Sequence, residues 1–501
     1  MPIYDLTYRG WKGARTRLPA WFPILENTIR LAQRNKLLIL MYRASALPVL
    51  VAIVILYIRY NFEARLGERF HGGRGQIPNY FVFDLPSYFK FSRSRGLAIL
   101  IAGIVGSGAI AGDRRGNTLE TLFSRAITRG DYLWGRFLGL FSLVLGATLI
   151  PGIVIWLADN LFSQDANRLA ITLAYPMKIT AWALILATSS SLLILAFSAL
   201  IQRAWLALAT FGGFILLGTM VTQAISAIFE RARTESIPDF IRGFGYFAGL
   251  AGVQRSIFGL TTREAGLSAS PVSGAIMLAF LFLVSIAILR WRVRADRGGV
   301  VSESSPTGAS PNETGAGRSR PTASRNGSAT WWRSPMLRST WSRGSPGCSA
   351  PTAPASRPSS NASRGSCTPS TGTVRVLGRD LRHEPAAFTK VGICPDVDKF
   401  FEEMRGVGFV TWLARLHGME KRAARAAAEV ALERVGLTDV MTKKIGAMSK
   451  GMRQRVKFAQ AIVHEPEVLL LDEPLNGMDP LARHATVELI GRLGREGRPW
   501  S

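Results

Sequence analysis

The chain has 501 residues, of which 48% are hydrophobic, and its formal net charge is +27. The apolar content is too high for a disordered protein, and 3 cysteines are too few for a disulfide scaffold. The excess positive charge is spread along the chain, with +17 in residues 1–301, +6 in 302–368 and +4 in 369–501. No single basic patch dominates, so the composition gives no reason to expect a nucleic-acid partner.

Residues 1–301 are predicted to form an α-helical polytopic membrane domain with six transmembrane helices. A membrane-spanning helix needs about 20 mostly apolar residues. The second apolar run is the shortest, but its glycines suit close helix packing. The expected spans are Leu37–Tyr57, Gly96–Gly112, Phe137–Leu157, Ile179–Ile201, Ala204–Phe229 and Ser273–Trp291.

Basic residues around the spans predict that both termini lie in the cytoplasm. Arginines and lysines cluster before the first span, after the second and after the sixth, although the loop from Arg59 to Arg95 also carries seven basic residues. The first 36 residues contain no apolar signal-peptide core. Within them, Phe22, Leu25 and Ile29 have helical spacing, which predicts either a helix at the membrane interface or an extension of the first span.

The remaining sequence has two parts of different composition. Residues 302–368 are rich in Ser, Arg, Pro and Thr without periodicity, which is typical of a disordered linker. Residues 369–501 read as a soluble α/β segment. We expect strands at Thr373–Leu377 and Val468–Leu471, and helices at Ala423–Val435 and Gly451–His464.

The strongest chemical motif is the run Val468-Leu-Leu-Leu-Asp472-Glu473-Pro474. Its apolar half predicts a buried parallel strand, which would deliver two carboxylates to the sheet edge where nucleotides bind. Asp472 would hold Mg²⁺, through water, and Glu473 would activate the attacking water. The alternative is that both acids are ordinary turn residues.

Two further motifs flank this strand. Upstream, Ser449 and Gly451 open a helix, where free N–H groups and the helix dipole favour an anion. Downstream, Asn476-Gly-Met-Asp479-Pro forms an aspartate-containing loop. This ordered set resembles the ATPase domain of ABC transporters, with its signature helix, Walker B strand, catalytic glutamate and D-loop. The resemblance implies that Ser449 and Gly451 contact the γ-phosphate of ATP held by the opposite subunit, with Asp479 in the D-loop. Lys450 and Met452 depart from the commonest signature.

Two other segments extend the resemblance. The run Val391-Gly-Ile-Cys-Pro-Asp396 resembles the strand and loop that end in the Q-loop glutamine. Asp396 stands at the position of that glutamine. It is either a ligand of Mg²⁺ or water, or an ordinary loop acid. The run Gly106–Arg115, followed by Thr118-Leu-Glu120, resembles ABC-2-type permeases, in which this stretch docks on the ATPase. Leu119, Leu122, Phe123 and Ala126 would form its apolar face; otherwise it is a solvated basic loop.

The phosphate loop that such an ATPase needs, GxxxxGK[ST], is not in the printed sequence, which contains no Gly-Lys dipeptide. Shifting the reading frame over Gly347–Pro369 is compatible with a run containing GPNGAGKST. We therefore hypothesise that residues 302–368 are ATPase coding sequence translated out of frame, a frameshift that joins a permease to its neighbour. A strand and a switch histidine are also expected after Arg498, but the sequence continues only with Pro499-Trp500-Ser501.

The sequence therefore predicts a permease domain at 1–301, the suspect segment at 302–368 and a partial P-loop α/β ATPase domain at 369–501. The expected function is ATP-driven export across the cell inner membrane, with the ATPase part cytoplasmic and defective as written. The alternative is a non-catalytic permease whose tail is inert and which relies on a separate ATPase subunit. ATP and Mg²⁺ are the expected cofactors, and a second copy or homologous half-transporter is the expected partner. A chromosome-segregation ATPase shares these motifs, but six spans and the lack of long heptad arms argue against it.

Overall fold

The computed structural model describes residues 19–69, 93–115, 118–123, 125–163, 167–231, 245–259, 270–293, 376–379, 384–395 and 400–495. These residues fall into two compact units. The helical unit comprises Pro19–Leu119 and Arg129–Arg294, and the C-terminal unit comprises Glu120–Thr128 and the described residues after 375. The predicted linker at 302–368 lies outside the described residues.

The helical unit contains six helices that are long and apolar enough to cross a membrane, as the sequence predicts. The third candidate span is longer at both ends than its apolar run, because the helix continues through polar residues from Arg129 to Phe162. Two helices were not predicted, a short one at Arg168–Thr172 and a 13-residue one at Tyr246–Phe258 before the last span. The helices are α1 (Phe22–Gln33), α2 (Lys36–Arg69), α4 (Arg93–Arg115), α5 (Thr118–Phe123, continuing into the C-terminal unit), α6 (Arg129–Phe162), α7 (Arg168–Thr172), α8 (Tyr175–Leu200), α9 (Ala204–Arg231), α11 (Tyr246–Phe258) and α12 (Pro271–Arg292).

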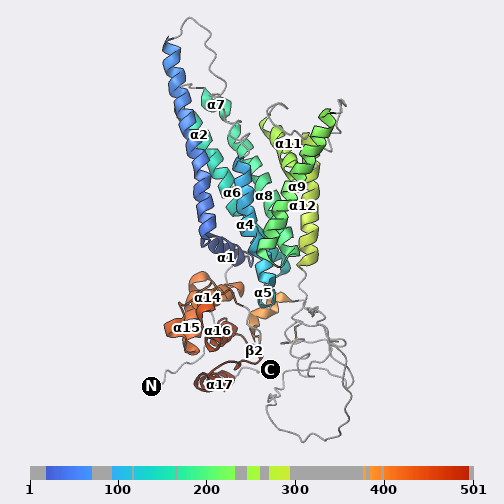
Figure 1. The fold of residues 1–501 in the computed structure, drawn as a ribbon. Helices are drawn as coiled ribbons and strands as arrows, with labels where there is room; N and C mark the ends of the chain where they lie inside the picture. Colours follow the sequence, from blue (N-terminus) through green and yellow to red (C-terminus); the bar gives the residue numbers. More distant parts are fainter. Residues whose placement is uncertain are drawn as a thin grey trace, which may run out of the picture. The chain divides into compact units, whose positions relative to one another are not determined.

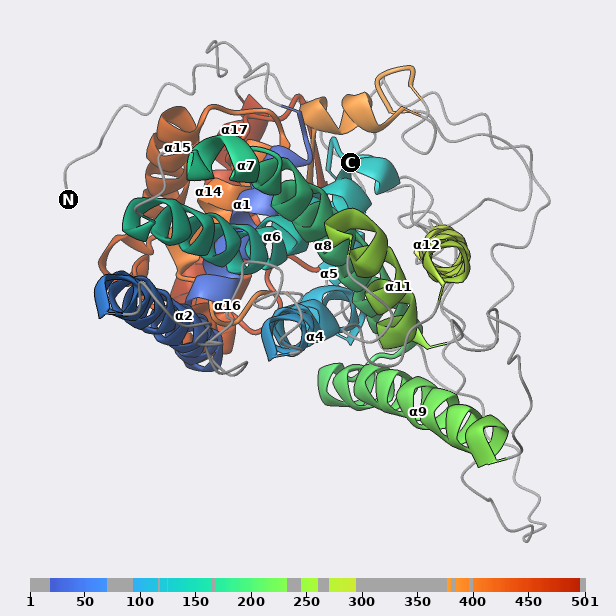
Figure 2. The same cartoon turned by 90° about the horizontal axis from the view of Figure 1, so that it is seen from above.

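Helix α8 is the centre of the helical unit. It contacts α4, α6, α9, α11 and α12, and its candidate span is the most buried of the six. Seen from above, α2 and α12 lie on opposite sides of it (Figure 2). Helix α1 lies across the end at which α2 begins, whereas α7 and α11 lie at the opposite end (Figure 1).

Helix α1 packs on α6 through a face other than that of Phe22, Leu25 and Ile29, whose spacing predicts a helix at the membrane interface or an extension of the first span. Its buried side chains include Ile24 and Thr28, while Phe22, Leu25 and Ile29 are only half-buried. A Cβ atom placed on Gly135 of α6 would lie 2.6 Å from Cβ of Ile24, and one on Gly139 would lie 2.8 Å from Cβ of Thr28. The two small residues, one helical turn apart, let the two backbones approach closely, and this approach decides which face of α1 is buried.

Buried ionic clusters lie near both ends of α6. At its N-terminal end, Arg136 pairs with Asp113 of α4. At its C-terminal end, Asp159 is fully buried, accepts a hydrogen bond of 2.8 Å from Tyr60 and pairs with Arg168 at 3.0 Å. Arg136 and Asp159 are 23 positions apart, a rise of about 35 Å in a helix, which is close to the thickness of a bilayer core. The apolar length of α6 thus separates two polar layers.

The C-terminal unit is built on two parallel strands, β1 (Val391–Cys394) and β2 (Val468–Leu471), with Val391 opposite Val468 and Cys394 opposite Leu471. Side chains of both strands contribute to a small core, which consists of Val376, Ala387, Phe388, Val391, Ile393, Val468 and Leu470. The other elements are η2 (Pro385–Lys390), α14 (Gly406–Leu416), α15 (Lys421–Arg434), η3 (Thr438–Val440), η4 (Ile445–Ala447), α16 (Lys450–Ile462) and α17 (Pro480–Arg495).

These elements confirm most local predictions for the C-terminal segment. The predicted strand Val468–Leu471 is β2, and the two predicted helices are α15 and α16. Of the strand expected at Thr373–Leu377, only Val376 and Leu377 are described. Val376 pairs with Arg379 across a tight turn in which Leu377 and Gly378 both have positive φ, so this end of the expected strand turns back on itself.

Candidate functional site

The C-terminal edge of the two strands carries the predicted acidic pair. Asp472 follows β2 directly, and its backbone N–H donates to the carbonyl oxygen of Cys394, the last residue of β1, over 2.9 Å. This bond extends the parallel ladder by one residue and fixes where the chain leaves the sheet. Asp472 is half-buried and Glu473 is exposed. The two neighbouring acids therefore differ in their access to solvent.

Glu473 has an unusual backbone conformation. Its φ is +46°, in the left-handed region that side-chain-bearing residues rarely occupy. Its carbonyl oxygen accepts a hydrogen bond of 3.1 Å from Nε2 of Gln454 in α16, and its Oε2 accepts one of 3.3 Å from Nδ2 of Asn476. Such strain persists where surrounding contacts hold it, and it is common at active sites. Gln454 therefore holds the backbone of Glu473, and Asn476 holds its carboxylate.

Ser449 is the N-cap of α16. Its Oγ accepts a hydrogen bond of 3.2 Å from the backbone N–H of Met452, and both Ser449 and the first residue of the helix, Lys450, are exposed. The capping bond satisfies one N–H of the first turn. An exposed helix N-terminus with a hydroxyl cap is the local structure that the anion-site prediction requires.

Gly451 brings this helix end close to the predicted D-loop. A Cβ atom on Gly451 would lie 3.2 Å from the carbonyl oxygen of Gly477 and 4.0 Å from Oδ1 of Asp479. Asp479 itself accepts a hydrogen bond of 3.1 Å from Ala482 N and so caps α17. The tertiary structure thus gathers Ser449, Gly451 and Asp479 into one neighbourhood, which Gln454 connects to Glu473.

The carboxylates fit a magnesium ion of the kind that keeps most of its water. Within the described residues there is no group of three metal-ligating side chains. Mg²⁺ is usually bound by one or two carboxylates together with phosphate oxygens and water. Asp472 can supply the carboxylate of such a site, and a bound nucleotide can supply the phosphate oxygens. Asp396, the other predicted ligand, lies outside the described residues.

A second group of contacts in the C-terminal unit involves the segment Glu120–Thr128, here called the docking segment. Leu122 and Ile127 are buried, and Ala126 packs against the core cluster around β1 and β2. Two predicted members of its apolar face, Leu122 and Phe123, have exposures of 1% and 8%, while Leu119 belongs to the helical unit and is half-buried. Ile127, with 0% exposure, is a further member that the sequence reading missed.

The docking segment also inserts a buried arginine into the C-terminal unit. Nη1 of Arg125 lies 2.9 Å from Nε2 of His417, which follows the last residue of α14. The His417 ring stacks on that of His464, with 3.6 Å between centroids and 6° between planes, and Nε2 of His464 lies 3.1 Å from the carbonyl oxygen of Val391. Burial lowers the pKa of Arg125 to about 10, so it stays charged at neutral pH.

Several residues of these sites gave no recognisable motif. Gln454 and Gln460 lie on the buried face of α16, where Nε2 of Gln460 donates to the carbonyl oxygen of Ile393 over 2.8 Å. Their only signal is the presence of amides on the face of a helix that otherwise buries apolar residues. Arg125, His417 and His464 are far apart in sequence and carry no mutual pattern, so only the fold reveals their contact.

The comparisons with known proteins decide the family of this part of the chain. Residues 361–476 match the family model described as ABC transporter. The chain carries an ABC transporter domain at its C-terminal end. The six apolar helices before it fit a permease fused to this domain.

Curated relatives of this ABC transporter domain include bacterial ATP-binding proteins. The uncharacterized ABC transporter ATP-binding protein YxlF of Bacillus subtilis is 34% identical over 129 residues, which are 26% of this chain and 42% of that protein. The bacitracin transport ATP-binding protein BcrA of Enterococcus faecalis is 36% identical over 129 residues, 26% of this chain and 41% of that protein. A solved ATP-binding subunit of an ABC transporter aligns over 27% of this chain and 56% of its own, with 24% identity and a TM-score of 0.25.

The chain thus spans about two fifths of the length of these two curated relatives. The family match ends at residue 476, so it covers α16, β2, Asp472 and Glu473 and stops before Asp479.

Proposed function

We propose that this chain is an ATP-driven membrane exporter of the ABC type, with an ABC-2-type permease domain at 1–301 and a partial ATPase domain at 369–501. The contact between the docking segment and the C-terminal unit carries this proposal. The docking segment lies between the second and third candidate spans, and it packs on the core that supports Asp472 and Glu473. A segment in that position can transmit movement between an ATP site and membrane helices.

The site residues have distinct roles in this proposal. Asp472 holds Mg²⁺ through water, and Glu473 takes a proton from the attacking water as general base. Ser449, Gly451 and Asp479 are exposed or half-buried at one surface of the unit, as a site completed by a second copy requires. Asp396 contributes a further oxygen ligand. When bound, Mg²⁺ neutralises charge on the phosphates during phosphoryl transfer.

In this proposal the printed chain is defective in hydrolysis. Backbone amides of the phosphate loop and its lysine hold the phosphates in such ATPases, and this sequence contains no Gly-Lys dipeptide. The frameshift over residues 302–368 accounts for the missing loop. Sequencing the DNA across this segment tests that part directly, because a shifted frame without GPNGAGKST would contradict it.

The functional test compares two full-length chains in lipid nanodiscs. The printed chain is expected to hydrolyse ATP at background rate, with or without Glu473→Gln. A chain with the shifted frame restored over residues 302–368 is expected to hydrolyse ATP, and Glu473→Gln is expected to lower that rate by about 10²–10⁴-fold, the usual contribution of a general base. A printed chain whose turnover depends on Glu473, or a restored chain without such turnover, would overturn the proposal.

The missing phosphate loop also favours a second candidate function, in which the chain is a non-catalytic permease and its tail is inert. A separate ATPase subunit would then occupy the docking segment. This alternative predicts that such a subunit copurifies with the full chain from a membrane extract, and that Ala126→Asp abolishes the association.

We locate the whole protein in the cell inner membrane, with the C-terminal unit in the cytoplasm.

A further inference from the structure

Arg125 begins a continuous series of contacts that ends at β1. Its guanidinium meets His417 at the end of α14, His417 stacks on His464 just after α16, and His464 meets the carbonyl oxygen of Val391 in β1. The chain leaves β1 at Cys394, whose carbonyl oxygen accepts from the N–H of Asp472. Four elements of the C-terminal unit are therefore connected to one side chain of the docking segment.

The chemistry of these groups fixes the direction of the first bond. A guanidinium has only donors, so Nε2 of His417 must carry a lone pair, and a neutral His417 then has its proton on Nδ1. Nε2 of His464 faces a carbonyl oxygen and therefore donates its proton. Arg125 is 1% exposed and His417 is 3% exposed, so water does not compete at this contact.

The apolar contacts of the docking segment do not fix its position as precisely as the bond from Arg125 does. Ala126, Leu122 and Ile127 are buried through contacts that depend on surface area and tolerate small shifts. A hydrogen bond from a planar, charged donor to a single imidazole nitrogen has a narrow geometry. Burying a guanidinium also costs free energy that a methionine of similar length would avoid. A buried arginine at position 125 therefore binds the docking segment to the C-terminal unit less tightly than an apolar side chain would, but it fixes the position of the segment along that surface.

We propose that Arg125 is a positioning residue that fixes the register of the docking segment on the C-terminal unit, with the stacked pair His417–His464 as its acceptor. This inference rests on the proposed function, in which the docking segment connects permease and ATPase parts. It adds that the matching surface is recognised by a neutral imidazole at position 417. An ATPase domain without an acceptor at this position would bind the segment in a shifted register.

Hydrogen exchange of the full chain in nanodiscs, measured without nucleotide, tests this role. Two peptides are followed, Leu122–Thr128 and Trp412–Met419, and α15 serves as the reporter of a folded C-terminal unit. Arg125→Met keeps most of the volume and removes the donor. We expect it to speed exchange in both peptides by about tenfold or more, the effect of losing one charged hydrogen bond, while α15 is unchanged. Arg115→Met, an exposed arginine, is the matched control and should change neither peptide.

Variants of the acceptor separate hydrogen bonding from packing. His417→Gln retains an acceptor oxygen and is expected to keep protection close to that of the unsubstituted chain, whereas His417→Leu is expected to lose it. Arg125→Met combined with His417→Leu should be no worse than either alone, because both remove the same bond.

Wild-type protection in Arg125→Met would overturn the proposal, since packing alone would then hold the segment. If Arg125→Met also loosens α15, the comparison of His417→Leu with His417→Gln decides, and equal exchange in those two variants would reject the role of the acceptor. Because no nucleotide is present, a failure of ATP hydrolysis in the restored chain leaves this result unaffected, and the two proposals fail separately.

Discussion

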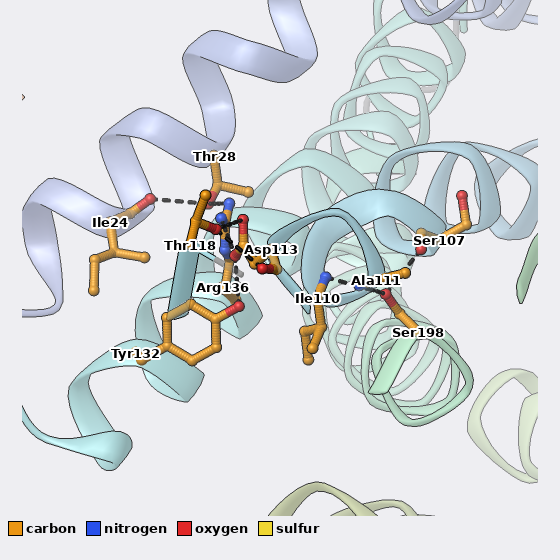
Figure 3. Close-up of polar contacts among 10 residues, drawn as sticks. All are labelled: Ile24, Thr28, Ser107, Ile110, Ala111, Asp113, Thr118, Tyr132, Arg136 and Ser198. Atoms are coloured by element: carbon orange, nitrogen blue, oxygen red, sulfur yellow. Dashed lines mark hydrogen bonds and ion pairs between the residues drawn. The ribbon is translucent and has the colours of Figure 1, made fainter. Parts of the chain in front are cut away.

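The hydroxyl of Tyr132 donates to Oδ2 of Asp113 over 2.6 Å inside the helical unit (Figure 3). The same carboxylate pairs with Arg136, which also donates to Oγ1 of Thr28 in α1 over 3.2 Å. Oγ1 of Thr118 donates to the backbone carbonyl of Asp113 over 3.1 Å and so fixes the start of α5. One buried acid at the end of α4 thus connects α1 and α6 to the helix that leads into the docking segment.

Removing this acid should destabilise the helical unit more than removing its neutral partner. Asp113→Ala leaves Arg136 buried without its counter-charge, and we expect a loss of about 3–5 kcal/mol in the free energy of unfolding. Tyr132→Phe removes one hydrogen bond, and we expect a loss of about 1 kcal/mol. Denaturant titration of the purified chain in detergent measures both, with Arg115→Ala as an exposed control. Equal midpoints for Asp113→Ala and Tyr132→Phe would show that the Asp113–Arg136 ion pair contributes no more to stability than the single hydrogen bond from Tyr132.

The contact of α1 with α6 gives a second prediction, in which three identical substitutions in one helix differ in effect. Gly139→Ala would place a Cβ atom 2.8 Å from Cβ of Thr28, and Gly135→Ala would place one 2.8 Å from the backbone oxygen of Trp21, so both should displace α1 and lower thermal stability. Gly146→Ala meets nothing within 4 Å. It should raise stability by up to about 1 kcal/mol, because alanine favours the helix.

Thermal unfolding of the three variants in the same detergent measures this difference, and a cysteine introduced in α1 reports its accessibility to a thiol reagent. Greater accessibility is expected for the variants at Gly135 and Gly139 alone. A stabilising effect of Gly139→Ala would contradict the close approach of the two backbones.

Ser449 allows the capping role to be separated from the nucleotide role. Ser449→Ala removes the cap of α16 and should cost about 1 kcal/mol of stability in the C-terminal unit. Ser449→Asp keeps a capping oxygen and favours the helix dipole, so stability should be retained. In the frame-restored chain, however, its negative charge should abolish ATP hydrolysis, since it would face the phosphate. Stability comes from denaturant titration and hydrolysis from phosphate release. Full hydrolysis by Ser449→Asp would remove Ser449 from the site.

Local sequence patterns were sufficient for elements whose signal lies within one segment. The apolar runs predict all six candidate spans, because crossing a bilayer requires length and hydropathy in a single helix. The run Val468–Leu471 predicts β2 with its bounds, because a buried parallel strand must be apolar on both faces. The order of Ser449, Asp472 and Asp479 indicates the ABC transporter domain, which the family match confirms.

Patterns within one segment could not predict which side chains meet across segments. The spacing of Phe22, Leu25 and Ile29 predicts a helix, but it does not show which face packs on α6, because that face depends on Gly135 and Gly139 in another helix. The left-handed backbone of Glu473 and its support by Gln454 arise only when α16 packs on the sheet, which it contacts through β1.

The sequence by itself determined the six helices long and apolar enough to cross a membrane and the family of the C-terminal domain, since both depend on residue type and order along the chain. Tertiary structure alone decided that Arg125 meets His417 across 292 positions and that His417 stacks on His464. A buried arginine requires an acceptor, but any neutral imidazole, carbonyl or carboxylate can serve. Only the packing of α14, α16 and β1 around the docking segment selects which one does.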